Sequence, residues 1–130
     1  RTAIILFCLL VSSACAAGPR PAFPGAEGWA ATTPGGRGGR ILRVTTLAAE
    51  GPGSLSEALA TRGPRIVVFE VGGVIDLAGK IIEVREPFLT VAGQTAPSPG
   101  ITLIRGGLLI GSHDIVIRHV RVRPWQLLPS

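Results

Sequence analysis

Short apolar runs separated by turn residues dominate the chain from residue 65 onward. Each run is bounded by Gly, Pro or a charged residue, and the runs are RIVVFEV, VIDL, IIEV, FLTV, ITLIR, LLI and DIVIRHVRVR. Runs of this length, rich in Val and Ile, are typical of β-strands. Their centres lie 7 to 12 residues apart, which leaves no room for a crossover helix. We therefore predict an all-β fold.

The spacing of these strands favours a coil. Three consecutive spacings add up to about 20 to 28 residues, which suits one turn of a solenoid with three strands. An approximate internal repeat aligns residues 67–73 with 88–94 and residues 81–84 with 101–104, at offsets of 21 and 20. These features predict a parallel β-helix of about two to three coils. A sandwich of hairpins is the alternative, although the Asn-Gly and Asp-Gly turns of tight hairpins are missing.

Alternation within the strands predicts which side chains enter the core. Val67 and Phe69 share one face of their strand, which we expect to point inward. In the last run, Ile115 shares its parity with residue 117, but Val120 and residue 122 have the opposite parity. We therefore predict a sharp bend at Arg118-His119, which would keep both aliphatic pairs in the core.

One short helix is predicted before the strands. Ser54 as N-cap and Glu57 three residues later form a capping box, and Gly63-Pro64 ends the segment. The apolar face consists of Leu55, Ala58 and Leu59. A helix of this length is unstable alone in water, so its apolar face must cover other apolar residues.

The segment before that helix lacks periodicity. Residues 18–40 are rich in Gly and Pro and predict a looping lead-in, which we expect Phe23 and Trp29 to pin down. Residues 41–45 suit one short strand.

The first residues have the pattern of a secretory signal peptide. Arg1 precedes an apolar stretch over residues 3–11, and Ala14 and Ala16 form an A-x-A cleavage site. We expect a signal peptide over 1–16, a mature domain over 17–130, and a secreted, periplasmic or cell-surface protein. Alternatives are a buried strand or core helix, and a lipoprotein signal with Cys15 lipidated. Because the chain lacks Met, we do not expect position 1 to be the natural start.

The charge balance and the cysteines of the chain indicate which kinds of partner and chemistry to expect. Basic residues number 13 against 8 acidic ones, which favours an acidic partner such as a polyuronate or a nucleic acid. A coding bias toward Arg is the alternative cause. Cleavage would remove both cysteines, Cys8 and Cys15, and with them any disulfide or thiol chemistry. No apolar run is long enough to span a bilayer.

Motifs that indicate specific chemistry are few. The GGRGGR run at 35–40 lacks the third glycine of a dinucleotide loop and has too few repeats for a nucleic-acid segment, so we expect no nucleic-acid binding. The consecutive Ser112, His113 and Asp114 do not indicate a triad, because neighbours on a strand point apart. His113 and His119 lack the accompanying ligands of a metal site.

Longer blocks carry a family resemblance. AFPGAEGWAATTPGGRGGR, GPGSLSEAL, RIVVFEVGGVIDL, VAGQTAPSPGITLIRGG and DIVIRHVRVRP follow one another over residues 22–124. In this order they resemble the N-terminal blocks of secreted bacterial pectate lyases. The resemblance implies a right-handed parallel β-helix with an N-terminal capping helix over residues 54–61, and calcium-dependent β-elimination of polygalacturonate.

The same resemblance sets limits on the site. The family's calcium-binding acids and catalytic Arg lie on later coils, and no residue from 1 to 130 matches them. After Pro124, the run 125–130 departs from the usual continuation. We therefore expect an inactive fragment of a lyase whose parent requires calcium. The alternative is a noncatalytic surface β-helix that binds acidic polysaccharide, for which the candidate residues are Arg118, Arg121 and Arg123.

Overall fold

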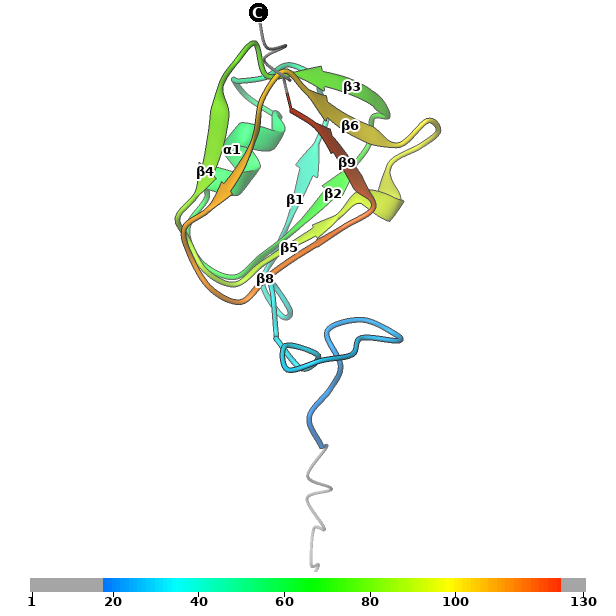
Figure 1. The fold of residues 1–130 in the computed structure, drawn as a ribbon, viewed down its shortest axis with the longest axis vertical. Coiled ribbons are helices and arrows are strands. Elements are labelled where there is room, and N and C mark those ends of the chain that lie inside the picture. Colours follow the sequence, from blue (N-terminus) through cyan, green and yellow to red (C-terminus); the bar gives the residue numbers. More distant parts are fainter. Residues whose placement is uncertain (1–17, 125–130) are drawn as a thin grey trace, which may run out of the picture.

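Three parallel sheets form the sides of a β-helix in the computed structural model, which describes residues 18–124 (Figure 1). The expected signal peptide lies outside these residues. The first sheet contains β1 (Arg40–Val44), β2 (Arg65–Phe69), β5 (Leu89–Ala92) and β8 (Ile115–Arg118). The second contains β3 (Gly73–Asp76), β6 (Ile101–Ile104) and β9 (Val120–Arg123), and the third contains β4 (Ile81–Val84) and β7 (Gly107–Ile110). The predicted all-β parallel β-helix is confirmed.

The strands stack in two complete coils and the beginning of another. One coil is β2-β3-β4, the next is β5-β6-β7, and β8 and β9 start the third, which agrees with the predicted two to three coils. Stacked positions are separated by 19 residues, from Ile101 to Val120, up to 28 residues, from Gly73 to Ile101. Within residues 18–124, no helix is long and apolar enough to cross a membrane.

The predicted internal repeat is wrong in its alignment. Residues 81–84 do not stack on 101–104; Ile81 pairs with Gly107, and Ile101 pairs with Gly73. The turn after β5, with the 3-10 helix η1 (Gly93–Thr95), is longer than the turn after β2. Because the turns differ in length, no constant offset relates successive coils, and the short aliphatic strands resemble one another regardless of their sheet.

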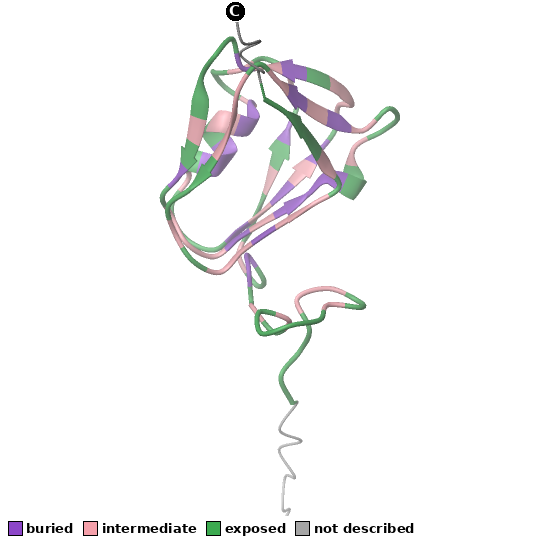
Figure 2. Cartoon of the chain, in the orientation of Figure 1, coloured by how far each residue is buried: buried purple, intermediate pink, exposed green. Residues whose placement is uncertain are grey.

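The core lies between the three sheets and follows the predicted alternation. Val67 and Phe69 are buried, and Val67 stacks through Val91 on Ile117. Figure 2 shows buried residues alternating with exposed ones along the strands. Aliphatic side chains of neighbouring coils therefore form continuous rows inside the coil.

The predicted helix closes one end of this core. It is α1 (Leu55–Ala60), with Ser54 as N-cap accepting from the Glu57 amide at 3.3 Å. The Glu57 carboxylate accepts from the Gly53 amide at 2.7 Å, one residue before the position that a capping box predicts. Its buried residues are Leu55, Ala58 and Leu59, as predicted.

The opposite end of the core is open along the described residues. The predicted bend occurs at His119, which has a φ of 57° and lies between β8 in the first sheet and β9 in the second. The bend does turn both aliphatic pairs inward, since Ile117 stacks on Val91 and Val122 on Leu103. Val122 is nevertheless 40% exposed, because no further coil within residues 18–124 covers it.

The lead-in segment, residues 18–39, lies outside the first sheet (Figure 1). Phe23 packs there as predicted, with the Arg118 guanidinium carbon 4.1 Å from its ring centroid. Trp29 is fully exposed, so the prediction that it pins the segment is wrong. Glycine at position 36 allows this segment to lie close to the coils, because a Cβ there would lie 1.7 Å from the carbonyl oxygen of Arg65.

Candidate functional site

The three candidate arginines do not form one cluster. Arg118 ends β8 in the first sheet, whereas Arg121 and Arg123 lie on β9 in the second sheet, beyond the bend at His119. Arg118 stacks on the ring of Phe23, a cation-π contact that fixes its side chain in place. Arg118 therefore serves the packing of the lead-in segment.

Arg121 and Arg123 share the outer face of the second sheet. Both are exposed, and they stand two residues apart on one strand, a spacing of about 7 Å. Arg121 donates from Nη1 to the carbonyl oxygen of Pro99 at 3.1 Å. Among residues 18–124, neither guanidinium has a carboxylate within ion-pair distance. This pair therefore stays the candidate for binding an external anion, a prediction that the structure does not test.

A neutralised pair lies on the same sheet. Asp76 accepts from Arg105 Nε at 2.8 and 3.0 Å and also from its Nη2. Hydrogen bonds from Arg105 lower the pKa of Asp76, and the Ala78 amide adds to this effect. Because each charge satisfies the other, the net positive charge of this face comes from Arg121 and Arg123.

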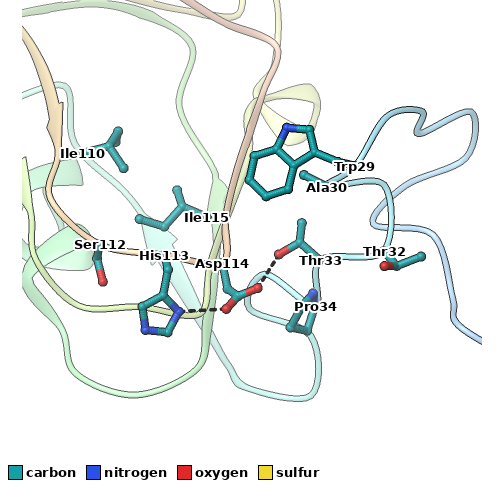
Figure 3. Close-up of a pocket in the computed structure, with 10 residues that line it drawn as sticks. All are labelled: Trp29, Ala30, Thr32, Thr33, Pro34, Ile110, Ser112, His113, Asp114 and Ile115. Atoms are coloured by element: carbon teal, nitrogen blue, oxygen red, sulfur yellow. Dashed lines mark hydrogen bonds and ion pairs between the residues drawn. The ribbon is translucent and has the colours of Figure 1, made fainter.

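A second candidate is an open hollow between the lead-in segment and the start of β8. It has a volume of about 700 Å³ and is lined by Trp29, Ala30, Thr32, Thr33, Pro34, Ile110, Ser112, His113, Asp114 and Ile115 (Figure 3). Its polar side chains come from the turn between β7 and β8 and from two threonines of the lead-in segment. Figure 3 shows the indole of Trp29 above Thr33, and the carboxylate of Asp114 between Thr33 and the imidazole of His113.

Asp114 is the best-connected polar group of the hollow. Its Oδ1 accepts from Thr33 Oγ1 at 2.7 Å, and its Oδ2 lies 2.8 Å from His113 Nδ1. The hydrogen bond with His113, followed by that with Thr33, lowers the pKa of Asp114 below its usual value. The His113 ring meets Phe88 edge-on at 5.4 Å. Oδ1 thus joins the turn to the lead-in segment, and Oδ2 holds the neighbouring imidazole within the turn, so both oxygens have structural partners.

Calcium fits poorly with what these residues offer. Within residues 18–124, no three His, Cys, Asp or Glu side chains are grouped so that they could hold a metal ion. The carboxylates of Asp76, Glu83 and Asp114 are instead occupied by Arg105, Arg85 and His113. The side chains of residues 18–124 therefore do not fit a calcium ion.

Sequence reasoning overlooked Arg65. Its side chain is fully buried, and its guanidinium donates to carbonyl oxygens of Ala58, Leu59, Gly63, Glu86 and Pro87. The alternation that places Val67 inward also places Arg65 inward, so the parity could have identified it.

Known proteins match most of this chain. Over 103 residues, the chain is 44% identical to a probable pectate lyase C of Aspergillus flavus. It is 45% identical over the same length to proteins of that name from Emericella nidulans and Aspergillus terreus. The chain is similar to fungal pectate lyases. No protein-family model matches it.

The match covers only a part of each relative. It covers 78% of this chain but 24% of each of these relatives, so the chain spans about a quarter of their length. The resemblance to pectate lyases is supported, whereas the bacterial branch that the sequence blocks suggested is not, because the matched proteins are fungal.

Proposed function

We propose that this chain is the N-terminal portion of a secreted pectate lyase whose parent cleaves pectate by calcium-assisted β-elimination. The observation that carries this proposal is the identity of 44 to 45% over 103 residues with probable pectate lyases. The parallel β-helix supports it, since a solenoid adds further coils at its end without altering the first ones.

The role of the chain within this parent is to start the coil. Helix α1 covers one end of the core, and β2 and β3 begin the stack on which later coils are built. Since residues 18–124 contain no group suited to a metal, we assign the calcium ligands and the catalytic base to later coils. The 130-residue chain alone is then inactive.

The proposal is tested with a fusion protein. It joins residues 18–123 of this chain to the part of the Aspergillus flavus pectate lyase C that follows its own matched region. Formation of unsaturated product from polygalacturonate is followed by ultraviolet absorbance, with and without a calcium chelator. We expect a folded fusion with chelator-sensitive activity and no turnover by the 130-residue chain.

The intact Aspergillus enzyme is the control for the assay. Turnover by the 130-residue chain would contradict its assignment as an inactive fragment. A fusion that fails to fold, or that folds without activity while the intact enzyme cleaves, would count against the lyase assignment.

Secretion belongs to the same proposal. A signal peptide over residues 1–16 would be removed, so exported protein would begin at Ala17, or at a lipidated Cys15. The partner of the parent is an acidic plant-type polysaccharide.

One observation favours a second function, a noncatalytic surface β-helix that binds acidic polysaccharide. Arg121 and Arg123 present two exposed guanidinium groups without carboxylate partners among the described residues. Retention on immobilised polygalacturonate together with an inactive fusion would favour this function.

A further inference from the structure

The lead-in segment follows the stack from one coil to the next. A Cβ on Gly39 would strike the backbone of Pro64, just before β2, and one on Gly36 would strike the Arg65 carbonyl and approach the Thr90 amide. One on Gly35 would meet the side chains of Thr90 and Val116. Moving toward the N-terminus, the segment thus passes β2, then β5, then β8.

The next contact of the segment is with the third coil. Thr33 Oγ1 donates to Asp114, directly before β8, at 2.7 Å. Before Thr33 the segment turns, since the Thr33 amide donates to the Ala30 carbonyl and the Ala31 amide to the Gly28 carbonyl. Trp29 lies in this turn and is 100% exposed.

The hollow beside Trp29 agrees with this placement. It is lined by Ile110 and Ile115, which belong to the rows of inward side chains because they stack on Val84 and Leu89. Inward side chains can be reached only from the open end of the coil. Trp29 therefore borders a hollow that inward side chains of the open end also line (Figure 3).

We propose that Trp29 is a docking anchor for the coil that stacks beneath β8 in the parent protein. This inference rests on the proposed function, because the parent supplies the occupant: a strand parallel to β8 and the turn before it. The relatives are about four times as long as the matched part, which leaves ample chain for this coil. The strand would place an aliphatic side chain against Ile110 and Ile115, which line the hollow together with Trp29.

A sugar ring is the rival occupant of the hollow. The lining is largely apolar, and its one carboxylate, Asp114, has both oxygens engaged by Thr33 and His113. That carboxylate stays ionised and repels uronate anions. An apolar, partly enclosed space at the end of a core instead favours burial of protein side chains.

The test uses the fusion protein defined above, with Trp29→Ala and two comparison variants. Burial of an indole by the next coil predicts that Trp29→Ala lowers the thermal midpoint by roughly 5 °C. Trp29→Phe should give a smaller fall. Ile41→Ala is the matched control, since Ile41 is a large apolar residue, 64% exposed, on β1 at the capped end; its midpoint should stay unchanged.

Each outcome separates this inference from the proposed function. An active fusion in which Trp29→Ala shifts the midpoint no more than Ile41→Ala would overturn the docking role while the lyase assignment stands. A stable Trp29→Ala fusion with weaker retention on polygalacturonate would assign the hollow to sugar. A destabilised Trp29→Ala variant of an inactive fusion would support docking and count against the lyase.

Discussion

The guanidinium of Arg65 donates a hydrogen bond to the carbonyl oxygen of Leu59 at 2.7 Å inside the protein. A second bond reaches Ala58 at 3.2 Å, and a third reaches Pro87, before β5, at 3.1 Å. Burial lowers the pKa of Arg65, and the nearby Glu86 opposes this effect. One side chain thus satisfies the last carbonyl groups of α1 and ties the capping helix to the first two coils.

Replacing Arg65 with Met should destabilise this end strongly. Arg65→Met keeps much of the volume but leaves several buried carbonyl groups without donors, so the free energy of unfolding should fall by about 3 kcal/mol. Urea unfolding of the fusion protein measures this. Arg40→Met is the control, because Arg40 is exposed and pairs with Arg65 in the ladder. Equal stabilities of the two variants would refute the role of Arg65.

The lead-in segment should depend on glycine at position 36. In Gly36→Ala the new Cβ would lie 1.7 Å from the Arg65 carbonyl oxygen, so the segment must move away, at a cost of about 3 kcal/mol. Gly107→Ala is the matched control, since no atom lies within 4 Å of its Cβ position. Limited proteolysis should cut Gly36→Ala within residues 18–39 earlier than the control. Equal cleavage rates would contradict the close contact.

Local patterns predicted the elements, but not what joins them. Alternation and capping identified α1, the strands and the bend at His119, because each depends on neighbouring residues. Gly36 was assigned no role, since its close approach to Arg65 is a contact between distant segments. Trp29 was expected to pack, because an aromatic side chain is usually buried. Its exposure depends on contacts between segments far apart in the sequence, which local patterns do not reveal.

The site was harder to predict for the same reason. Arg118, Arg121 and Arg123 are close in the sequence, and only the bend at residue 119 separates Arg118 from the other two. The alignment of coils failed because it assumed a constant repeat, whereas the turns differ in length. Each residue added to a turn shifts the side chains that follow it to new neighbours, so the contacts at such a turn cannot be predicted from a constant repeat.

Acid should weaken the link between the lead-in segment and the third coil. The folded pKa of Asp114 is lowered, so its contribution to stability is present above the unfolded value of about 3.9 and is lost as pH falls through the lower folded value. We expect Asp114→Asn to have a lower thermal midpoint than the original fusion protein at neutral pH, and the difference to shrink near pH ~2.

The comparison for this titration is Glu27→Gln, which removes an exposed acid of the lead-in segment. Its midpoint should follow that of the unsubstituted protein at every pH. A constant difference between Asp114→Asn and the unsubstituted protein down to the lowest pH would argue against the linkage.

Binding of polyuronate should depend on β9. In Arg121→Gln/Arg123→Gln, retention on polygalacturonate should fall roughly tenfold at low salt, and the remaining binding should depend less on salt, because two cations are removed. Arg43→Gln/Arg85→Gln removes two arginines that are paired with Glu70 and Glu83, and should have little effect. Affinity electrophoresis with both double variants decides whether the unpaired arginines matter or only the net charge.

The 130-residue chain should associate with itself. Strands β7, β8 and β9 each have a ladder partner on one side only among the described residues, and inward side chains such as Ile110 and Val122 are 44% and 40% exposed at the open end. Unpaired parallel edges beside exposed aliphatic groups are a template for further pairing. With about three coils, the stack is also near the minimum that solenoids need.

Size-exclusion chromatography over a range of concentrations should therefore show oligomers or a loosely packed chain. The fusion protein, whose next coil covers this end, should run as a monomer. A monodisperse 130-residue chain with a sharp, cooperative thermal transition would show that the open end is stable as it is, and would remove the reason for a further coil beneath β8.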